Sequence, residues 1–191
     1  WAKSNGWDLK ELMTYIGWRD FNSALRYLDI SEEDLGSRFE YQRTNAKWAD
    51  VCANLDRFVD LKEIHSNIVL QLCCTVNVFN VYYIDQVAAW IQKNRKSFNF
   101  VYWNMLHEIW YFAINRLPRG VKSALKLHLE TCDIPREFRE EFDNIIDFMN
   151  TGESSDGTAM LAAMRELDRR RNQNLSHVMP ELADLIGYDK T

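Results

Sequence analysis

Apolar residues recur along much of the chain at intervals of three and four positions, which is typical of helices that bury one face. In one such stretch the apolar side chains are Trp48, Val51, Cys52, Leu55 and Phe58. The same spacing predicts helices over residues 7–17, 20–27, 47–61, 83–94, 116–132, 134–150, 159–173 and 177–187.

Three segments instead carry continuous apolar and β-branched runs of strand length. They cover residues 27–31, 67–79 and 98–106. The second is the most apolar, and we expect it to be a parallel strand buried on both faces. Because helices alternate with these strands, the pattern predicts an α/β fold. It would comprise a partial parallel sheet or partial barrel with crossover helices, followed by a helical C-terminal region.

On this interpretation the chain has three parts. Residues 1–26 form a helical N-terminal segment, residues 27–108 the α/β portion, and residues 109–191 a helical extension. Glycine (7) and proline (3) are scarce among the 191 residues, which disfavours an all-β fold with its many tight turns.

The balance of charge limits the partners. With 23 basic and 28 acidic residues the net charge is −5, so the chain lacks the clustered positive charge of a general nucleic-acid binder. No apolar run approaches the roughly 20 residues that span a bilayer, and no signal-peptide pattern follows Trp1. We therefore expect a cytoplasmic protein with neither a membrane nor a nucleic-acid partner.

The four cysteines, Cys52, Cys73, Cys74 and Cys132, form no CxxC or CxxxCxxC group. We expect them to be free thiols that fill the core in a reducing compartment. The arginine run at 169–171 has two interpretations: a solvated helix end that complements the helix dipole, or a contact with phosphate.

A candidate site follows from the expected strand at 27–31. Ser31 ends this strand, and ligand sites of α/β folds lie at the carboxyl ends of parallel strands. Arg43 follows 12 positions later, far enough for the chain to fold back over that edge. A hydroxyl and a guanidinium there would hold a ribose and a carboxylate. The alternative is a helix-capping serine and a surface arginine.

Five blocks of the sequence resemble the radical SAM superfamily, in particular its members with a twitch or SPASM-like extension. The blocks are SEEDLGSRFEYQRTNAKW, WADVCANLDRF, CCTVNVFNVYYIDQVAAWI, FVYWNMLHEIWYFAINRLPRGVK and LDRRRNQNLSHVMPELADLIGY. They occur in the same order as in that family and extend from about Tyr27 to Tyr188.

The resemblance implies that S-adenosylmethionine is the cofactor and that the substrate is a peptide or small molecule. It assigns Ser31 and Arg43 to the ribose and carboxylate of the cofactor, and places Asn77 at the border of the same pocket. Two features depart from the family. Glu32 and Glu33 replace an apolar residue and an aspartate, and the CxxxCxxC loop that holds the [4Fe–4S] cluster is absent. The expected activity therefore needs a full-length protein that supplies this loop.

Two further hypotheses remain open. Residues 6–29 resemble the last motif of tyrosine recombinases, in which Tyr27 would attack a DNA phosphodiester and Trp18 would donate a hydrogen bond to the phosphate. The arginines that such enzymes also need are absent before Trp18. Alternatively, the chain is a non-catalytic interaction module that docks through its helical C-terminal region.

Overall fold

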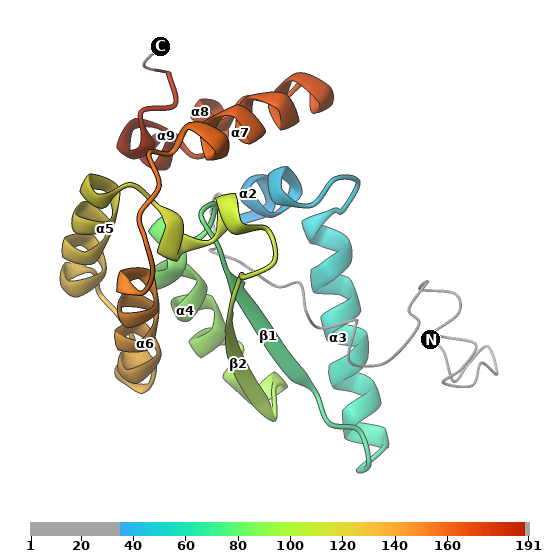
Figure 1. Ribbon diagram of the computed structural model, residues 1–191. Helices are drawn as coiled ribbons and strands as arrows, with labels where there is room; N and C mark the ends of the chain where they lie inside the picture. The colour runs from blue at the N-terminus through green and yellow to red at the C-terminus, as the bar shows by residue number, and fades with distance from the viewer. Residues whose placement is uncertain (1–34, 190–191) are drawn as a thin grey trace.

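The computed structural model describes residues 35–189, in which a two-stranded parallel sheet is surrounded by helices (Figure 1). Strand β1 covers Gln71–Val76 and strand β2 covers Phe100–Met105. They pair in parallel with Gln71 beside Phe100 and Val76 beside Met105. The prediction of an α/β fold is thus confirmed. The expected strand at 27–31 lies outside the described residues.

The connection between the two strands is a helical crossover, which parallel pairing requires. A short 3-10 turn, η1 (Val81–Tyr83), leads into helix α4 (Ile84–Lys93), and a second turn, η2 (Arg95–Ser97), leads out of it. Helix α4 buries Ile84, Val87, Ala88 and Ile91, which share one face at intervals of three and four. This face covers the sheet.

Two helices precede the sheet. Helix α2 covers Leu35–Gln42 and helix α3 covers Trp48–Ile64. The apolar face predicted for α3 packs inward, and Trp48 meets Trp90 of α4 edge to face with ring centroids 5.7 Å apart. The start of helix α3 therefore packs against α4, and α3 lies beside β1 (Figure 1).

The rest of the chain is helical, as expected (Figure 1). Its elements are η3 (Trp110–Phe112), η4 (Ile114–Arg116), α5 (Arg119–Thr131), η5 (Arg136–Phe138), α6 (Arg139–Asn150), α7 (Thr158–Arg171), α8 (Leu175–Val178) and α9 (Pro180–Ile186). Helix α6 packs on β2, where Trp103 meets Phe138 and Phe142 at 5.8 and 6.3 Å. A single buried cluster extends from Tyr41 to Tyr188, so these helices share the core of the sheet.

The two faces of the sheet differ, and this corrects the expectation for residues 67–79. In β1 the side chains of Leu72, Cys74 and Val76 are fully buried, whereas the alternate positions are only half-buried. Beside those positions in β2, Phe100 and Tyr102 are about half exposed (52% and 49%). The second face of β1 is thus only partly buried, and the prediction of burial on both faces was wrong.

The ends of helix α7 are set by two residues with left-handed backbone. Gly157 precedes the helix with φ 84°, and a Cβ at this position would lie 3.0 Å from Pro118 Cγ, so glycine suits both the backbone and the space. Asn172 ends the helix with φ 51°, a conformation that asparagine tolerates better than most residues. These two residues therefore set where α7 begins and ends.

Within residues 35–189, every helix is too short or too polar to cross a membrane. The four cysteines lie within the described residues and form no disulfide with one another, as predicted. Cys74 is buried and the others are partly buried.

Candidate functional site

A cavity of about 810 Å³ lies at the carboxyl ends of the two strands. Its walls come from the end of α2, the segments that follow β1 and β2, and one face of α7. Figure 1 shows α2 and α7 together at this end of the sheet. Ligands of parallel α/β sheets bind at this edge, and the volume suits a ligand the size of a nucleoside.

The floor of the cavity is a turn held by two asparagines. Asn77 Nδ2 and Asn80 Nδ2 both donate to the carbonyl of Thr75, at 3.2 and 2.9 Å. Asn80 Oδ1 accepts from the backbone amide of Asn77, and Asn77 Oδ1 accepts from that of Phe79. These bonds satisfy the backbone groups left where the strand ends. The side chain of Asn77 is therefore fixed in place beside the cavity.

The segment after β2 is tied to this turn by backbone hydrogen bonds. Leu106 N donates to Val76 O at 3.0 Å, and Val78 N donates to Phe112 O at the same distance. Phe79 and Phe112 pack against each other with ring centroids 4.8 Å apart, and Tyr111 packs on Phe112 at 4.7 Å. All three rings line the cavity and give it an aromatic wall.

Helix α2 is held in place by Arg38, which is 9% exposed. Its guanidinium lies 3.8 Å from the centroid of the Tyr83 ring, and Nη1 donates to Gln86 Oε1 at 2.7 Å. Tyr83 in turn donates to Glu181 Oε2 at 2.8 Å. Burial and the neighbouring Glu181 raise the pKa of Tyr83, so its hydroxyl stays a donor. These contacts join α2, α4 and α9, and so position the residues that follow α2.

Helix α7 is joined to α2 and to the C-terminal segment by two residues of its last turns. Arg171 Nη1 donates to the carbonyl of Tyr41 at 3.0 Å. Asp168 is 7% exposed, and its Oδ2 accepts from the amide of Leu175 at 2.7 Å and from the hydroxyl of Tyr188 at 2.6 Å. The carboxylate thus caps α8 and binds the end of the chain.

Tyr41 lies between the cavity and this buried carboxylate. It is 2% exposed, lines the cavity, and packs edge to face on Phe79 at 5.9 Å. Burial, followed by the nearby Asp168 carboxylate, raises the pKa of Tyr41 well above its ordinary value. Tyr41 is therefore a neutral phenol at physiological pH.

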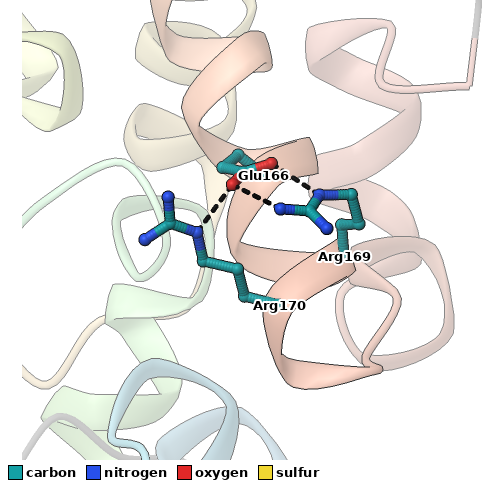
Figure 2. A network of polar contacts seen from close by, with 3 residues as sticks. All are labelled: Glu166, Arg169 and Arg170. Atoms are coloured by element: carbon teal, nitrogen blue, oxygen red, sulfur yellow. Dashed lines mark hydrogen bonds and ion pairs between the residues drawn. The ribbon is translucent and has the colours of Figure 1, made fainter.

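The exposed side of α7 carries a second carboxylate with two arginine partners (Figure 2). Arg169 donates to both oxygens of Glu166 at 2.8 Å, and Arg170 Nε donates to Glu166 Oε1 at 2.6 Å. These hydrogen bonds, that of Arg169 first, lower the pKa of Glu166 to about 2. Of the two arginines only Arg170 lines the cavity, together with Arg171.

The structure brings two of the three predicted site residues to one cavity. Arg43 and Asn77, 34 positions apart in sequence, both line it. Ser31, as well as Trp18 and Tyr27 of the recombinase hypothesis, lies outside the described residues. The arginine run divides into three environments: Arg171 makes a structural contact, Arg169 is an exposed ion-pair partner, and Arg170 lines the cavity. The contact with phosphate stays a prediction.

Sequence reasoning missed Tyr41 and Asn104, which also line the cavity. Asn104 was detectable in principle, because it is a polar residue near the end of an expected strand. Tyr41 was not, because its contacts at the cavity are with residues distant in sequence, Phe79 and Arg171.

The residues of the cavity fit S-adenosylmethionine but not an iron–sulfur cluster. The guanidinium of Arg43 suits a carboxylate, the amide of Asn77 suits a hydroxyl, and aromatic rings suit a nucleobase. In contrast, residues 35–189, which hold all four cysteines, contain no group of three or more His, Cys, Asp or Glu side chains able to hold a metal ion. No protein-family model, curated protein or solved structure matches this chain.

Proposed function

We propose that this chain is the S-adenosylmethionine-binding C-terminal part of a radical SAM enzyme that acts on a peptide or a small molecule. The observation that supports this most is the meeting of Arg43 and Asn77 at one cavity, at the carboxyl ends of parallel strands. The resemblance to the radical SAM superfamily assigns both residues to one pocket.

In this proposal Arg43 binds the carboxylate of the cofactor. A guanidinium offers two parallel N–H donors to a carboxylate, which gives orientation as well as affinity. Arg43 follows α2 directly, and its backbone amide donates to Phe39 O at 2.9 Å, which continues the helical hydrogen bonding by one residue. The helix therefore holds the base of the arginine side chain while its tip reaches the ligand.

Asn77 would bind a ribose hydroxyl. Its Oδ1 and Nδ2 each make one hydrogen bond within the turn, and each has the capacity for a second. Because the turn fixes the amide, binding a hydroxyl costs little additional side-chain entropy. Tyr111, half-buried beside Phe112, offers a ring on which an adenine can stack.

The chemistry itself depends on a group that this chain does not hold. A reduced [4Fe–4S] cluster, held by another part of the protein, would supply the one electron that radical chemistry with S-adenosylmethionine needs. The cysteines of this chain do not fit such a cluster. The part played by the chain is thus to bind and orient the cofactor and to surround it with aromatic side chains that exclude water.

Isothermal titration calorimetry with S-adenosylmethionine tests the binding role on the 191-residue chain. We expect saturable binding that weakens about tenfold in Arg43→Gln, since the charge-assisted pair with the carboxylate is lost. Arg57→Gln is the matched control, because Arg57 is exposed on α3 and outside the cavity. Circular dichroism shows whether both variants fold. Absence of binding, or equal losses in the two variants, would contradict the proposal.

The catalytic role requires a separate test on the complete product of the natural gene. After anaerobic reconstitution with iron and sulfide, we expect 5′-deoxyadenosine to form from S-adenosylmethionine. If an intact cluster forms and no 5′-deoxyadenosine appears, the enzymatic part of the proposal is wrong even where binding is observed.

A further inference from the structure

The cavity is locally basic although the chain is acidic. Three arginines, Arg43, Arg170 and Arg171, and two glutamates, Glu108 and Glu166, are among the described residues that line it. The whole chain has a net charge of −5. An excess of positive charge in a cavity attracts anionic ligands.

The negative charge of Glu166 is committed to arginine. Its carboxylate accepts three hydrogen bonds from Arg169 and Arg170, and these hold its pKa near 2, so it is fully ionised at physiological pH. Figure 2 shows the two arginines on opposite sides of this carboxylate. One carboxylate shared by two guanidinium groups leaves a net positive charge on this turn of α7.

Arg170 keeps its ligand-binding end available. Only its Nε bonds to Glu166, and no described residue accepts a hydrogen bond from its two terminal nitrogens. The bond at Nε restricts the side chain, so less conformational entropy is lost when the terminal nitrogens bind a ligand. Glu166 thus acts as a positioning residue for Arg170.

Arg171 provides a second cation one residue away. Its Nη1 is fixed by the carbonyl of Tyr41, and this bond holds the guanidinium between α7 and α2 at the wall of the cavity. Tyr41 itself is buried at the same wall. Two guanidinium groups therefore face the same cavity from the end of one helix: Arg171 is held by the Tyr41 carbonyl, and Arg170 is oriented by an exposed ion pair with Glu166.

We infer that Arg170 and Arg171 form an anion-binding subsite, which recognises a carboxylate or phosphate group of the substrate. Fixed guanidinium groups bind such planar or multidentate anions through paired N–H donors. The inference deepens the proposed function, because it names the substrate class for the same cavity. The proposed function assigns Arg43 to the cofactor carboxylate, so the two anionic groups would bind to different elements of the fold.

The test is a calorimetric titration of the 191-residue chain with inorganic phosphate and, separately, with glutarate. Inorganic phosphate represents a phosphate group of the substrate, and glutarate represents a carboxylate. The probe that binds more tightly identifies which of the two groups the subsite prefers. We expect at least one probe to bind saturably, with a dissociation constant below about 10 mM. Arg170→Gln should weaken this binding about tenfold, because charge-assisted hydrogen bonds are lost.

Arg169→Gln is the matched control, since it removes the same charge from the same carboxylate but does not line the cavity. At 0.15 M salt, screening should limit its effect to less than about twofold. Equal losses in both variants would mean that diffuse charge attracts the anion, and the subsite would be refuted. Lack of saturable binding by the unmodified chain would refute it as well.

Titration of the same proteins with S-adenosylmethionine separates this inference from the proposed function. We expect Arg170→Gln to bind S-adenosylmethionine within about twofold of the unmodified chain. If the chain binds anions through Arg170 but does not bind S-adenosylmethionine, the proposed function fails and the anion subsite stands. If the chain binds S-adenosylmethionine but Arg170→Gln does not weaken the binding of anions, the subsite is refuted and the proposed function stands.

Discussion

Helix α7 carries two carboxylates only two residues apart, and their surroundings give them opposite roles. Asp168 is 7% exposed and binds the amide of Leu175 and the hydroxyl of Tyr188. Glu166 is on the exposed side of the same helix and binds two arginines. The first joins three segments of the fold, while the second positions a charged side chain at the cavity.

The difference shows that burial, more than residue type, decides what an acidic group contributes. A buried carboxylate that loses its partners leaves donors unsatisfied in a medium of low dielectric, and that is costly. An exposed ion pair exchanges its partner for water at little cost. We therefore expect the stability of the protein to depend on Asp168. The charge of the cavity should depend instead on the turn of α7 that holds Glu166, Arg169 and Arg170.

The largest effect is expected from Asp168→Asn. The replacement removes the negative charge and presents amide hydrogens near the donors of Leu175 and Tyr188. The free energy of unfolding should fall by about 3 kcal/mol, measured by urea denaturation. Asp147→Asn, at an exposed position of α6, is the control and should change it by less than about 0.5 kcal/mol. Similar results for the two variants would show that the buried carboxylate is not a structural centre.

How far the sequence predicts this fold depends on the range of the interactions. The helices of the C-terminal region and the pairing of 67–79 with 98–106 follow from local periodicity and from the alternation of elements. The half-exposed face of β1 does not, because a run such as QLCCTV is apolar on both sides. What covers each side depends on elements distant in sequence.

The same limit applies to the site. Arg43 and Asn77 were identified from a family resemblance, and both line the cavity. The three arginines at 169–171 are alike in sequence, yet each has a different role. Their roles are set by the carbonyl of Tyr41, by Glu166 and by the position of the cavity. Periodicity says which face of a helix is apolar, but not which partner meets a polar residue there.

An intermediate effect is expected at alkaline pH. Burial and the Asp168 carboxylate raise the pKa of Tyr188, whereas an unfolded tyrosine ionises near pH 10. The unfolded state therefore loses its proton first, so stability is complete below pH 10 and decreases as the pH rises further. The expected loss is about 1.4 kcal/mol per pH unit for each tyrosine that stays protonated in the folded state.

Tyr188→Phe isolates this contribution. We expect urea denaturation at pH 9, 10 and 11 to show that the free energy of unfolding decreases less with pH in Tyr188→Phe than in the unmodified chain. The difference should equal the contribution of one tyrosine. Tyr102→Phe, at a half-exposed position of β2, is the control for the loss of a tyrosine hydroxyl elsewhere in the fold. An identical decrease in Tyr188→Phe would mean that Asp168 does not control the ionisation of Tyr188.

The smallest effect on stability is expected from Glu166→Gln. Because its partners are exposed, the melting temperature at pH 7 should change by no more than about 2 °C. The lowered pKa gives a stabilisation that is present above pH 4.5 and lost as the pH falls towards about 2, so any difference from the unmodified chain should vanish in acid. Differential scanning calorimetry at pH 7 and in acid measures the melting temperatures of the variant and of the unmodified chain. A fall of more than about 5 °C at pH 7 would place Glu166 in the same structural class as Asp168.

The most direct test of the central claim is a crystal structure of this chain with S-adenosylhomocysteine, which keeps the adenosine and the amino-acid carboxylate of the cofactor. The account predicts ligand density in the cavity at the ends of β1 and β2. The carboxylate should lie within about 3 Å of the Arg43 guanidinium, and the ribose should lie beside Asn77. A ligand bound elsewhere on the molecule, or bound in the cavity with its carboxylate away from Arg43, would contradict it.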